Sequence, residues 1–245
     1  MVALDILLRP VLLPILLWQA IGVRRAALSL PEAAGAREGV CGTGESLRLL
    51  IVGDSSAAGV GVAQQAEALS GQTVQRLEHR FQINWRLIAK TGATAQTTLD
   101  ALAQDRTERV DQFDVAVLVL GVNDAVRLRS KRVWLARHKA LRHVLIQHYG
   151  VRHIIVPAVP PLDKFPALTP LMRWMLGAHA KRLDRALSDR IAQEHNAYYI
   201  AFDLPLTPQA MASDGYHPNA QSYALFGERI ASRIAALWQT EIGDS

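Results

Sequence analysis

Two adjacent serines stand directly after an apolar run near residue 50. The segment LRLLIVGDSS, residues 47–56, ends in Asp54, Ser55 and Ser56. A serine hydroxyl becomes a strong nucleophile only when a neighbouring base removes its proton, and a histidine held by a carboxylate is the usual base. The stretch SDGYHPNA supplies such a pair, because Asp214 and His217 lie three residues apart on one short turn. These residue types are those of nucleophilic catalysis by serine.

Two further turns carry residues that could stabilise negative charge on a substrate oxygen. Such a charge needs hydrogen-bond donors that are already in place. Gly92 offers a backbone N–H that no side chain blocks, and Asn123, in the stretch GVND, offers a side-chain amide. Each cluster is also a good turn sequence when taken alone. Four such clusters at corresponding strand ends or loops together favour one shared site.

Apolar runs and helical patterns alternate downstream of residue 46. Five alternations of strand and helix predict a doubly wound parallel sheet with helices on both faces. Ligands of such sheets bind outside the carboxyl ends of the strands, where the serines, Gly92 and Asn123 all fall. Strands are predicted at 47–52, 83–89, 113–120, 153–159 and 197–202, and helices from Ser70 to Phe81, Thr94 to Gln104, Ser130 to Tyr149, Pro170 to His195 and Asn219 to Trp238.

The composition is that of a globular protein with a substantial core. The chain has 245 residues, of which half are hydrophobic and a fifth are charged. The formal charge is +5, but the basic residues form no stripe interleaved with aromatic residues, so nucleic acid is not expected as a partner. Cys41 is the only cysteine and cannot form an internal disulfide. The glycines near residue 53 match no dinucleotide or phosphate-binding spacing.

Four histidines recur every five residues, at His138, His143, His148 and His153. On a helix, five residues turn by about 500°, so neighbours in this series point about 140° apart and do not share a face. Zinc sites on helices use residues four apart, or cysteine partners. We therefore expect no metal, and no other cofactor.

The first 30 residues form a separate apolar segment. Arg9, Pro10 and Pro14 interrupt the apolar run, which makes a regular membrane-spanning helix costly. We predict a segment that lies on a membrane surface or inserts shallowly into it. A signal peptide, a single span and a helix packed on its own domain remain as alternatives.

The charges around this segment bear on where the protein resides. Arg24 and Arg25 follow the apolar run, and if the segment did span a membrane, they would hold the following domain in the cytoplasm. A secretory signal has the opposite charge order, although the small residues at 31–36 could form a cleavage site. The prediction is membrane association with a cytoplasmic catalytic domain, and export through an N-terminal signal is the alternative.

The chain divides at two composition changes. Residues 31–45 are rich in Gly, Ala and Glu and are predicted to link the N-terminal segment, 1–30, to a domain at 46–240. Within that domain, the apolar and proline-stiffened loop at 159–177 follows the fourth strand. This loop could simply cover the edge of the sheet. Alternatively, it forms a wall for an acyl chain, and its predicted substrate-binding residues are Phe165, Met172 and Trp174.

The four polar blocks together resemble those of the SGNH, or GDSL-type, esterase and lipase family. They occur in the family's order between residues 50 and 217, although Ser56 stands where the family's name has leucine. The G-x-S-x-G elbow of the ordinary α/β-hydrolase fold is absent from the sequence. The matching blocks are Gly53-Asp54-Ser55, Gly92, Gly121 to Asp124, and Asp214-x-x-His217.

The resemblance implies a three-layer α/β/α fold with a flavodoxin-like, five-stranded parallel sheet. It implies that Ser55, rather than Ser56, attacks an acyl carbonyl, while His217 acts as base and then acid and Asp214 orients it. The Ser55 and Gly92 N–H groups and the Asn123 side chain would form the oxyanion hole.

The implied activity is hydrolysis of carboxylic esters of the acyl-ester or lysophospholipid type, with a small acyl ester or a lipid as substrate. One alternative is a sugar or glycan O-acetyl esterase of the same fold. The other is a membrane-associated binding protein that keeps the fold without turnover.

Overall fold

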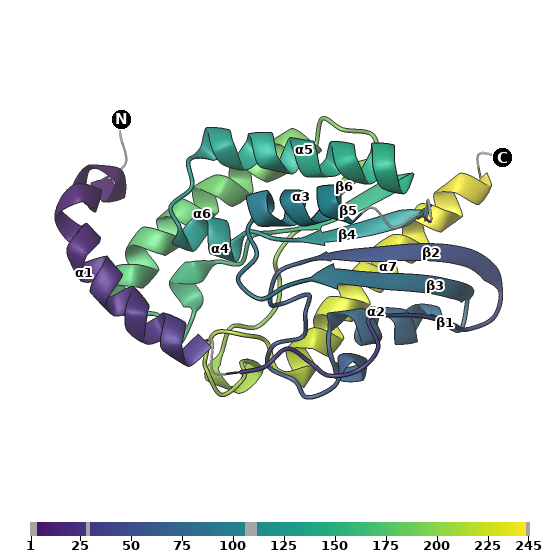
Figure 1. The fold of residues 1–245 in the computed structure, drawn as a ribbon, viewed down its shortest axis with the longest axis horizontal. Coiled ribbons are helices and arrows are strands. Elements are labelled where there is room, and N and C mark those ends of the chain that lie inside the picture. The colour runs from purple at the N-terminus through teal and green to yellow at the C-terminus, as the bar shows by residue number, and fades with distance from the viewer. Residues whose placement is uncertain (1–3, 28–29, 106–111, 244–245) are drawn as a thin grey trace.

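The protein is a three-layer α/β/α structure (Figure 1). The computed structural model describes residues 4–27, 30–105 and 112–243. Its strands are β1 (Glu38–Cys41), β2 (Glu45–Gly53), β3 (Phe81–Ala89), β4 (Val115–Val119), β5 (His153–Pro157) and β6 (Ala197–Ile200). Its α-helices are α1 (Leu4–Ala27), α2 (Leu69–Leu77), α3 (Ala95–Gln104), α4 (Val122–Val126), α5 (Lys131–Tyr149), α6 (Pro170–Ile191) and α7 (Ala220–Gly243).

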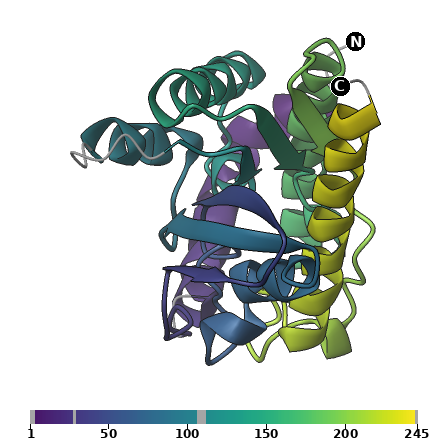
Figure 2. The same cartoon turned by 90° about the vertical axis from the view of Figure 1, so that its right-hand side faces the viewer.

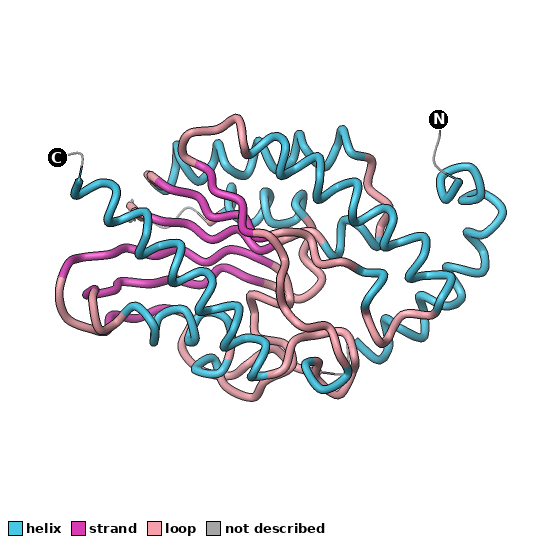
Figure 3. The backbone as a smooth tube through the Cα atoms, turned by 180° about the vertical axis from the view of Figure 1, so that it is seen from behind, coloured by secondary structure: helices cyan, strands magenta, loops and turns pink. Residues whose placement is uncertain are grey.

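The strands form one sheet in the order β1-β3-β2-β4-β5-β6. The five strands from β2 to β6 run parallel, and their order is that of flavodoxin-like proteins, with the switch point beside β2. Figure 3 shows the strands running together into the loops at their carboxyl ends. The parallel sheet was predicted, but the sheet has six strands rather than five, because β1 pairs antiparallel with the outer edge of β3.

The segment predicted as a linker, residues 31–45, contains β1 and is therefore part of the sheet. Its pairing with β3 places Glu38 opposite Arg86 and Cys41 opposite Ile83. Upstream of β1, the backbone N–H of Ala33 donates to the carbonyl of Ala58 at 3.2 Å. The strand escaped prediction because its residues are alternately exposed and half-buried and form no apolar run.

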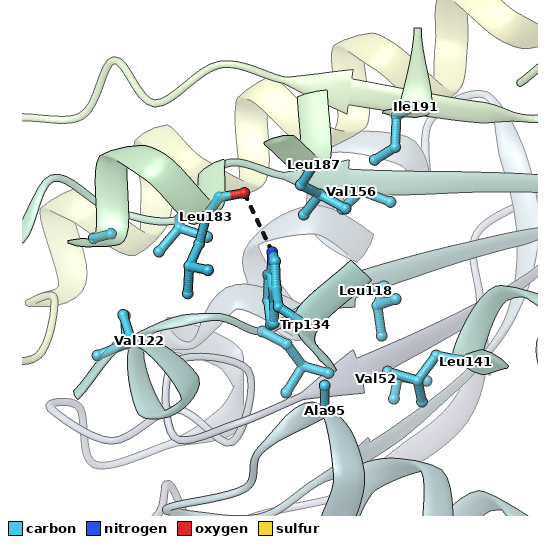
Figure 4. Packing of buried hydrophobic residues seen from close by; sticks show 14 of the residues in the cluster. Val52, Ala95, Leu118, Val122, Trp134, Leu141, Val156, Leu183, Leu187 and Ile191 are labelled. Atoms are coloured by element: carbon cyan, nitrogen blue, oxygen red, sulfur yellow. Dashed lines mark hydrogen bonds between the residues drawn. The ribbon is translucent and has the colours of Figure 1, made fainter. Parts of the chain in front are cut away.

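Alternating residues along β2 serve two separate cores. Leu50 and Val52 pack with α3, α5 and α6 on one face, and Leu49 and Ile51 pack with α2 and α7 on the other. Figure 2 shows these helix layers on either side of the sheet. In the first core, the buried Trp134 donates its indole N–H to the carbonyl of Leu183 at 3.3 Å and so joins α5 to α6 (Figure 4).

Local signals set several helix bounds. The hydroxyl of Thr94 accepts from the N–H of Thr97 at the start of α3, and Ser130 caps α5 in the same way. Gly150 ends α5 with a left-handed φ of 59°, as predicted. Ser70, however, does not cap α2. It is buried within the first turn of that helix, where its hydroxyl donates to Gln65 at 2.9 Å.

The N-terminal helix α1 packs along α6. Arg182 donates to the Asp5 carboxylate at 2.9 Å, and the Thr169 hydroxyl donates to Gln19 at 2.7 Å. Leu16 is buried between the two helices and belongs to the main core. Within the described part of the chain, no helix combines the length and the apolarity that crossing a membrane requires.

Candidate active site

The first part of the site is the turn that follows β2. The backbone N–H of Asp54 still donates to the carbonyl of Val119 on β4, at 3.1 Å. The chain then turns, with the N–H of Ala58 on the carbonyl of Asp54 and the N–H of Val60 on the carbonyl of Ser55. This turn places Ser55 at the carboxyl end of the sheet with 8 % of its surface exposed.

The second part is the loop before α7. One oxygen of the Asp214 carboxylate accepts from the backbone N–H groups of Tyr216 and His217, at 2.9 and 3.0 Å. The other oxygen lies 2.6 Å from Nδ1 of His217, whose Nε2 lies 2.9 Å from Oγ of Ser55. The structure therefore brings Ser55, His217 and Asp214 together in one line of hydrogen bonds, although 162 positions separate the serine from the histidine.

The electrostatics of this line define its protonation. Burial raises the pKa of Asp214, but the His217 side chain and the two backbone N–H groups outweigh that effect, so the pKa lies below its ordinary value. Asp214 is therefore a carboxylate, and it accepts the proton on Nδ1 of His217. The lone pair on Nε2 then faces the Ser55 hydroxyl and can accept its proton.

A second carboxyl group, that of Asp54, lies behind Ser55 in a buried position. It accepts from the Ser56 N–H at 3.0 Å and from the Asn123 amide at 3.4 Å. Burial raises its pKa to about 6, even though these hydrogen bonds and the nearby His217 act in the opposite direction. Asp54 thus braces the turn that carries the serine.

The structure also ties together the two turns predicted to hold an oxyanion. Asn123 lies in α4, and its amide donates to the carbonyl of Ala93, next to Gly92, at 3.0 Å. The same amide reaches the Asp54 carboxylate, so it bridges the turn after β3 and the turn after β2. Gly92 has a φ of +78°, and a Cβ there would meet no atom within 4 Å, so its backbone is open to a ligand. Neighbouring Asp124 accepts from the N–H of Ala95 at 2.9 Å and joins α4 to α3.

One residue that supports the site was missed by the sequence analysis. Glu32 accepts from both the N–H and the hydroxyl of Thr91, at 2.6 and 2.7 Å, and it pairs with Arg37. It therefore anchors the turn that carries Gly92. Burial of Glu32 raises its pKa, but the hydrogen bonds from Thr91 and Arg37 outweigh burial and lower it. A glutamate in a Gly- and Ala-rich stretch gives no sequence signal for such a role.

Ser55 and His217 open onto a cavity with mostly apolar walls. Its walls come from the ends of β4 and β5, from the segment after β6, and from the start of α7. Tyr216 packs edge-to-face on both Phe165 and His217, with ring centroids 5.3 Å apart in each pair. The apolar lining residues include Val122, Pro160, Phe165, Phe202, Leu204, Leu206, Met211, Tyr216 and Phe226.

Of the three predicted substrate-binding residues, only Phe165 lies in this wall. Met172 faces the core from the first turn of α6, and Trp174, two positions later, points to solvent. The loop at 159–177 contributes to the cavity up to the start of α6, and beyond that point the helix turns its side chains elsewhere. The segment DLPLTP after β6 supplies the wall instead, and its density of apolar residues before Asp214 is the signal that could have identified it.

Gly92 lines a second cavity of different character. Its other walls come from the turn after β3 and from one face of α3. Its polar lining residues are Lys90, Thr91, Thr97, Thr98, Asp100 and Gln104. Over the residues that the structure describes, no three His, Cys, Asp or Glu side chains are arranged to hold a metal ion.

The line of hydrogen bonds from Ser55 to Asp214 thus lies at the carboxyl end of a flavodoxin-like sheet. A family model described as the GDSL-like Lipase/Acylhydrolase family matches residues 51–225, and the chain belongs to this family of carboxylic ester hydrolases. The match spans the turn with Ser55 and both turns of the predicted oxyanion hole, together with Asp214 and His217. No curated protein sequence matches the chain.

Solved structures resemble the chain in fold. The psychrotrophic esterase EstA from Pseudoalteromonas sp. is 20% identical with a TM-score of 0.58, over 78% of this chain and 98% of that one. A member of the lipolytic protein G-D-S-L family from Veillonella parvula is 17% identical with a TM-score of 0.56, over 74% and 94%. An acetyl-xylooligosaccharide esterase from Geobacillus, crystallised as a mutant, is 15% identical with a TM-score of 0.51, over 77% and 94%.

Proposed function

We propose that the protein is a serine esterase that hydrolyses carboxylic esters through an acyl-enzyme, with Ser55 as nucleophile. Membership of the family supports the reaction class. The single observation that carries the assignment of residues is the line from Ser55 Oγ to His217 Nε2 at 2.9 Å and from His217 Nδ1 to Asp214 at 2.6 Å.

The geometry supports a two-step reaction. Ser55 Oγ attacks the carbonyl carbon while its proton passes to Nε2 of His217, and the carboxylate of Asp214 stabilises the resulting imidazolium. His217 then gives that proton to the leaving alcohol as the carbon–oxygen bond breaks. In the second step His217 takes a proton from water, which attacks the acyl-enzyme, and returns it to Ser55.

The tetrahedral oxyanion would be held by the N–H groups of Ser55 and Gly92 and by the amide of Asn123. The amide nitrogen of Asn123 donates to the carbonyl of Ala93 at 3.0 Å and to the Asp54 carboxylate at 3.4 Å. The longer contact is the weaker one, so we infer that Asn123 exchanges it for the oxyanion.

The apolar cavity beside Ser55 would hold the acyl group. Its walls are aliphatic and aromatic side chains, which gain free energy when an alkyl chain displaces water from them. We therefore infer that the substrates are esters of aliphatic acids with chains longer than acetate. A sugar O-acetyl esterase is the second candidate, because the cavity beside Gly92 carries more polar groups than the cavity beside Ser55 and so suits a hydroxylated alcohol better.

The test combines covalent labelling with a substrate series. A fluorophosphonate probe should label the wild type and Ser56→Ala but not Ser55→Ala, and labelling of Ser55→Ala would refute the assignment of the nucleophile. On p-nitrophenyl esters from acetyl to palmitoyl, kcat/KM should rise beyond acetyl. A maximum at acetyl, with activity on acetylated sugars, would favour the second candidate. A folded wild type without turnover or labelling would indicate a binding protein.

A further inference from the structure

The helix α1 exposes apolar side chains and directs polar ones toward the protein, which is the reverse of an ordinary surface helix. Two of its polar residues, Asp5 and Gln19, face the protein, where they bind Arg182 on α6 and Thr169 at its N-terminal cap. Its apolar residues point mostly outward. Of the thirteen exposed large hydrophobic side chains in the part of the chain that the structure describes, nine lie on α1. A surface helix normally directs its apolar stripe to the core and its polar face to water.

The most exposed residues of α1 form one stripe, which we call the outer face of α1. From Leu4 to Ile21 these five residues are spaced by three, four, seven and three positions. At such spacings the side chains project from the same side of a helix. Trp18 and Val11 are 74 % and 72 % exposed. The outer face comprises Leu4, Leu7, Val11, Trp18 and Ile21.

A cluster of cations lies at the corner between α4 and α5. This basic corner comprises Arg127, Arg129, Lys131 and Arg132, all of them exposed. Asp124 interacts electrostatically with Arg127 and Arg129, but the sequence from 125 to 149 contains no aspartate or glutamate that could neutralise Lys131 and Arg132. Lys131 and Arg132 stand in the first turn of α5, where the helix dipole disfavours positive charge. Their position therefore costs local stability, which an anionic partner would offset.

The outer face of α1 and the basic corner adjoin the same stretch of α6. Nε2 of His179 lies 3.0 Å from the carbonyl of Arg129, and Arg182, one turn later, holds Asp5 of α1. Figure 1 shows α1, α6 and the start of α5 together at one end of the molecule, toward which the carboxyl ends of the strands point. Trp174 of α6 is also exposed.

We propose that the outer face of α1 and the basic corner bind the surface of an anionic phospholipid bilayer. The apolar stripe would enter the boundary between headgroups and acyl chains, and the four cations would lie against the anionic headgroups. Trp18 is a residue type that favours this interface. A second copy of the chain fits less well, because pairing two outer faces would bring two basic corners toward each other. The carboxyl end of the sheet, with Ser55, would then lie on the membrane side of the molecule.

Flotation of the full chain with vesicles tests this proposal. We expect recovery with vesicles of phosphatidylcholine and phosphatidylglycerol, and weaker recovery with phosphatidylcholine alone. The double variant Val11→Asp with Trp18→Asp should lose binding to both by at least about tenfold, because charged groups replace the inserted stripe. Lys131→Glu with Arg132→Glu should lose about tenfold or more on anionic vesicles only, since each basic residue contributes separately. High salt should weaken the binding of the wild type to anionic vesicles in the same way as Lys131→Glu with Arg132→Glu.

The control is Val40→Asp, which places the same charge on an apolar side chain of β1 that is 66 % exposed. It should bind vesicles like the wild type. Ser55→Ala should also bind normally, so a failure of the esterase assignment does not affect this test. Circular dichroism monitors the folding of every variant. Lys131→Glu with Arg132→Glu should keep α5 intact, because acidic residues in the first turn stabilise a helix. The proposal would be overturned if the wild-type protein bound neither type of vesicle. A dimer that Val11→Asp with Trp18→Asp dissociates, without vesicle binding, would assign the outer face to a second copy.

Discussion

At the residue scale, two carboxyl groups of the site differ in their electrostatics. Asp214 receives hydrogen bonds from His217 and from two backbone N–H groups, and they hold its pKa below the ordinary value despite burial. Asp54 is deeply buried with fewer donors, and its pKa is raised to about 6. The first therefore suits a permanent anion that orients the imidazole, and the second suits a structural brace.

Replacement of Asp214 by asparagine should keep the fold and abolish most of the activity. The asparagine oxygen can still accept from the backbone N–H groups of the turn, but the tautomer of His217 would no longer be fixed. We expect kcat on a p-nitrophenyl ester to fall by about 10⁴ with little change in KM. The matched control is Asp203→Asn, since Asp203 forms an exposed ion pair with Arg229. Near-normal turnover of Asp214→Asn would contradict the role of Asp214.

The raised pKa of Asp54 predicts a pH dependence of stability. The folded protein holds the Asp54 proton more tightly than the unfolded chain, so this contribution is present below pH about 4 and is lost as the pH rises through about 6. The shift from 3.8 to about 6 corresponds to about 3 kcal/mol at about 1.36 kcal/mol per pH unit. The free energy of unfolding of Asp54→Asn, minus that of the wild type, should therefore rise by about that amount between pH 4 and pH 7. Urea unfolding measures this difference, and a difference independent of pH would contradict the burial of an ionisable Asp54.

At the scale of elements, the site depends on the segment that leads into β1. Glu32 holds the turn of Gly92, and Gln65, which is buried, donates to the carbonyls of Ala33 and Ala58. The segment is thus hydrogen-bonded both to the turn after β3 and to the turn that carries Ser55. The turns that carry Ser55 and Gly92, two of the three that would bind the oxyanion, are therefore held in place by a segment that is not part of the parallel sheet.

Removal of the Glu32 side chain should therefore impair catalysis without unfolding the protein. In Glu32→Ala the N–H and the hydroxyl of Thr91 lose their acceptor, and the turn of Gly92 gains freedom. We expect kcat to fall by about tenfold while KM changes less, because the lost interaction acts on the transition state. The comparison is Glu38→Ala, which removes an exposed carboxylate from β1. Equal kinetics for the two variants would show that Glu32 has no part in the site.

The elements differ in how far the sequence alone predicts them. The central strands β2 and β4 are largely apolar runs, and Thr94 and Gly150 carry the capping chemistry that sets helix ends, so these features follow from local physics. The residues of the line from Ser55 to Asp214 follow from motif and residue type. The edge strand β1 has no apolar run to reveal it, and it exists because β3 offers an unpaired edge. The wall of the apolar cavity comes from irregular segments, whose side-chain directions no periodicity defines.

At the scale of the whole molecule, two truncations separate the N-terminal helix from the catalytic unit. A chain that begins at Leu30 lacks α1 but keeps Glu32 and β1, so turnover of a small soluble ester should stay within about a few-fold of the wild type. The same truncation should no longer bind anionic vesicles. A chain that begins at Ser46 also lacks Glu32, which binds Thr91, and β1, which pairs with β3. This chain should lose both stability and turnover. Thermal unfolding measures the stability and ester hydrolysis measures the turnover. Failure of the first chain to fold would show that the domain needs the packing of α1 on α6 for its stability.

Four of the five tryptophans are either buried or exposed, and Trp85 is half-buried, so the fluorescence of the protein can report on its surface. Trp134 and Trp238 are buried in the two cores, whereas Trp18 and Trp174 are exposed at the end that carries α1. Indole emission shifts to shorter wavelength when the ring leaves water. A ligand that covers α1 should therefore change the red-edge emission and its quenching by iodide, while the emission of the buried rings stays constant. Trp18→Phe would remove the contribution of Trp18 to this signal and leave the emission of the buried rings as an internal standard.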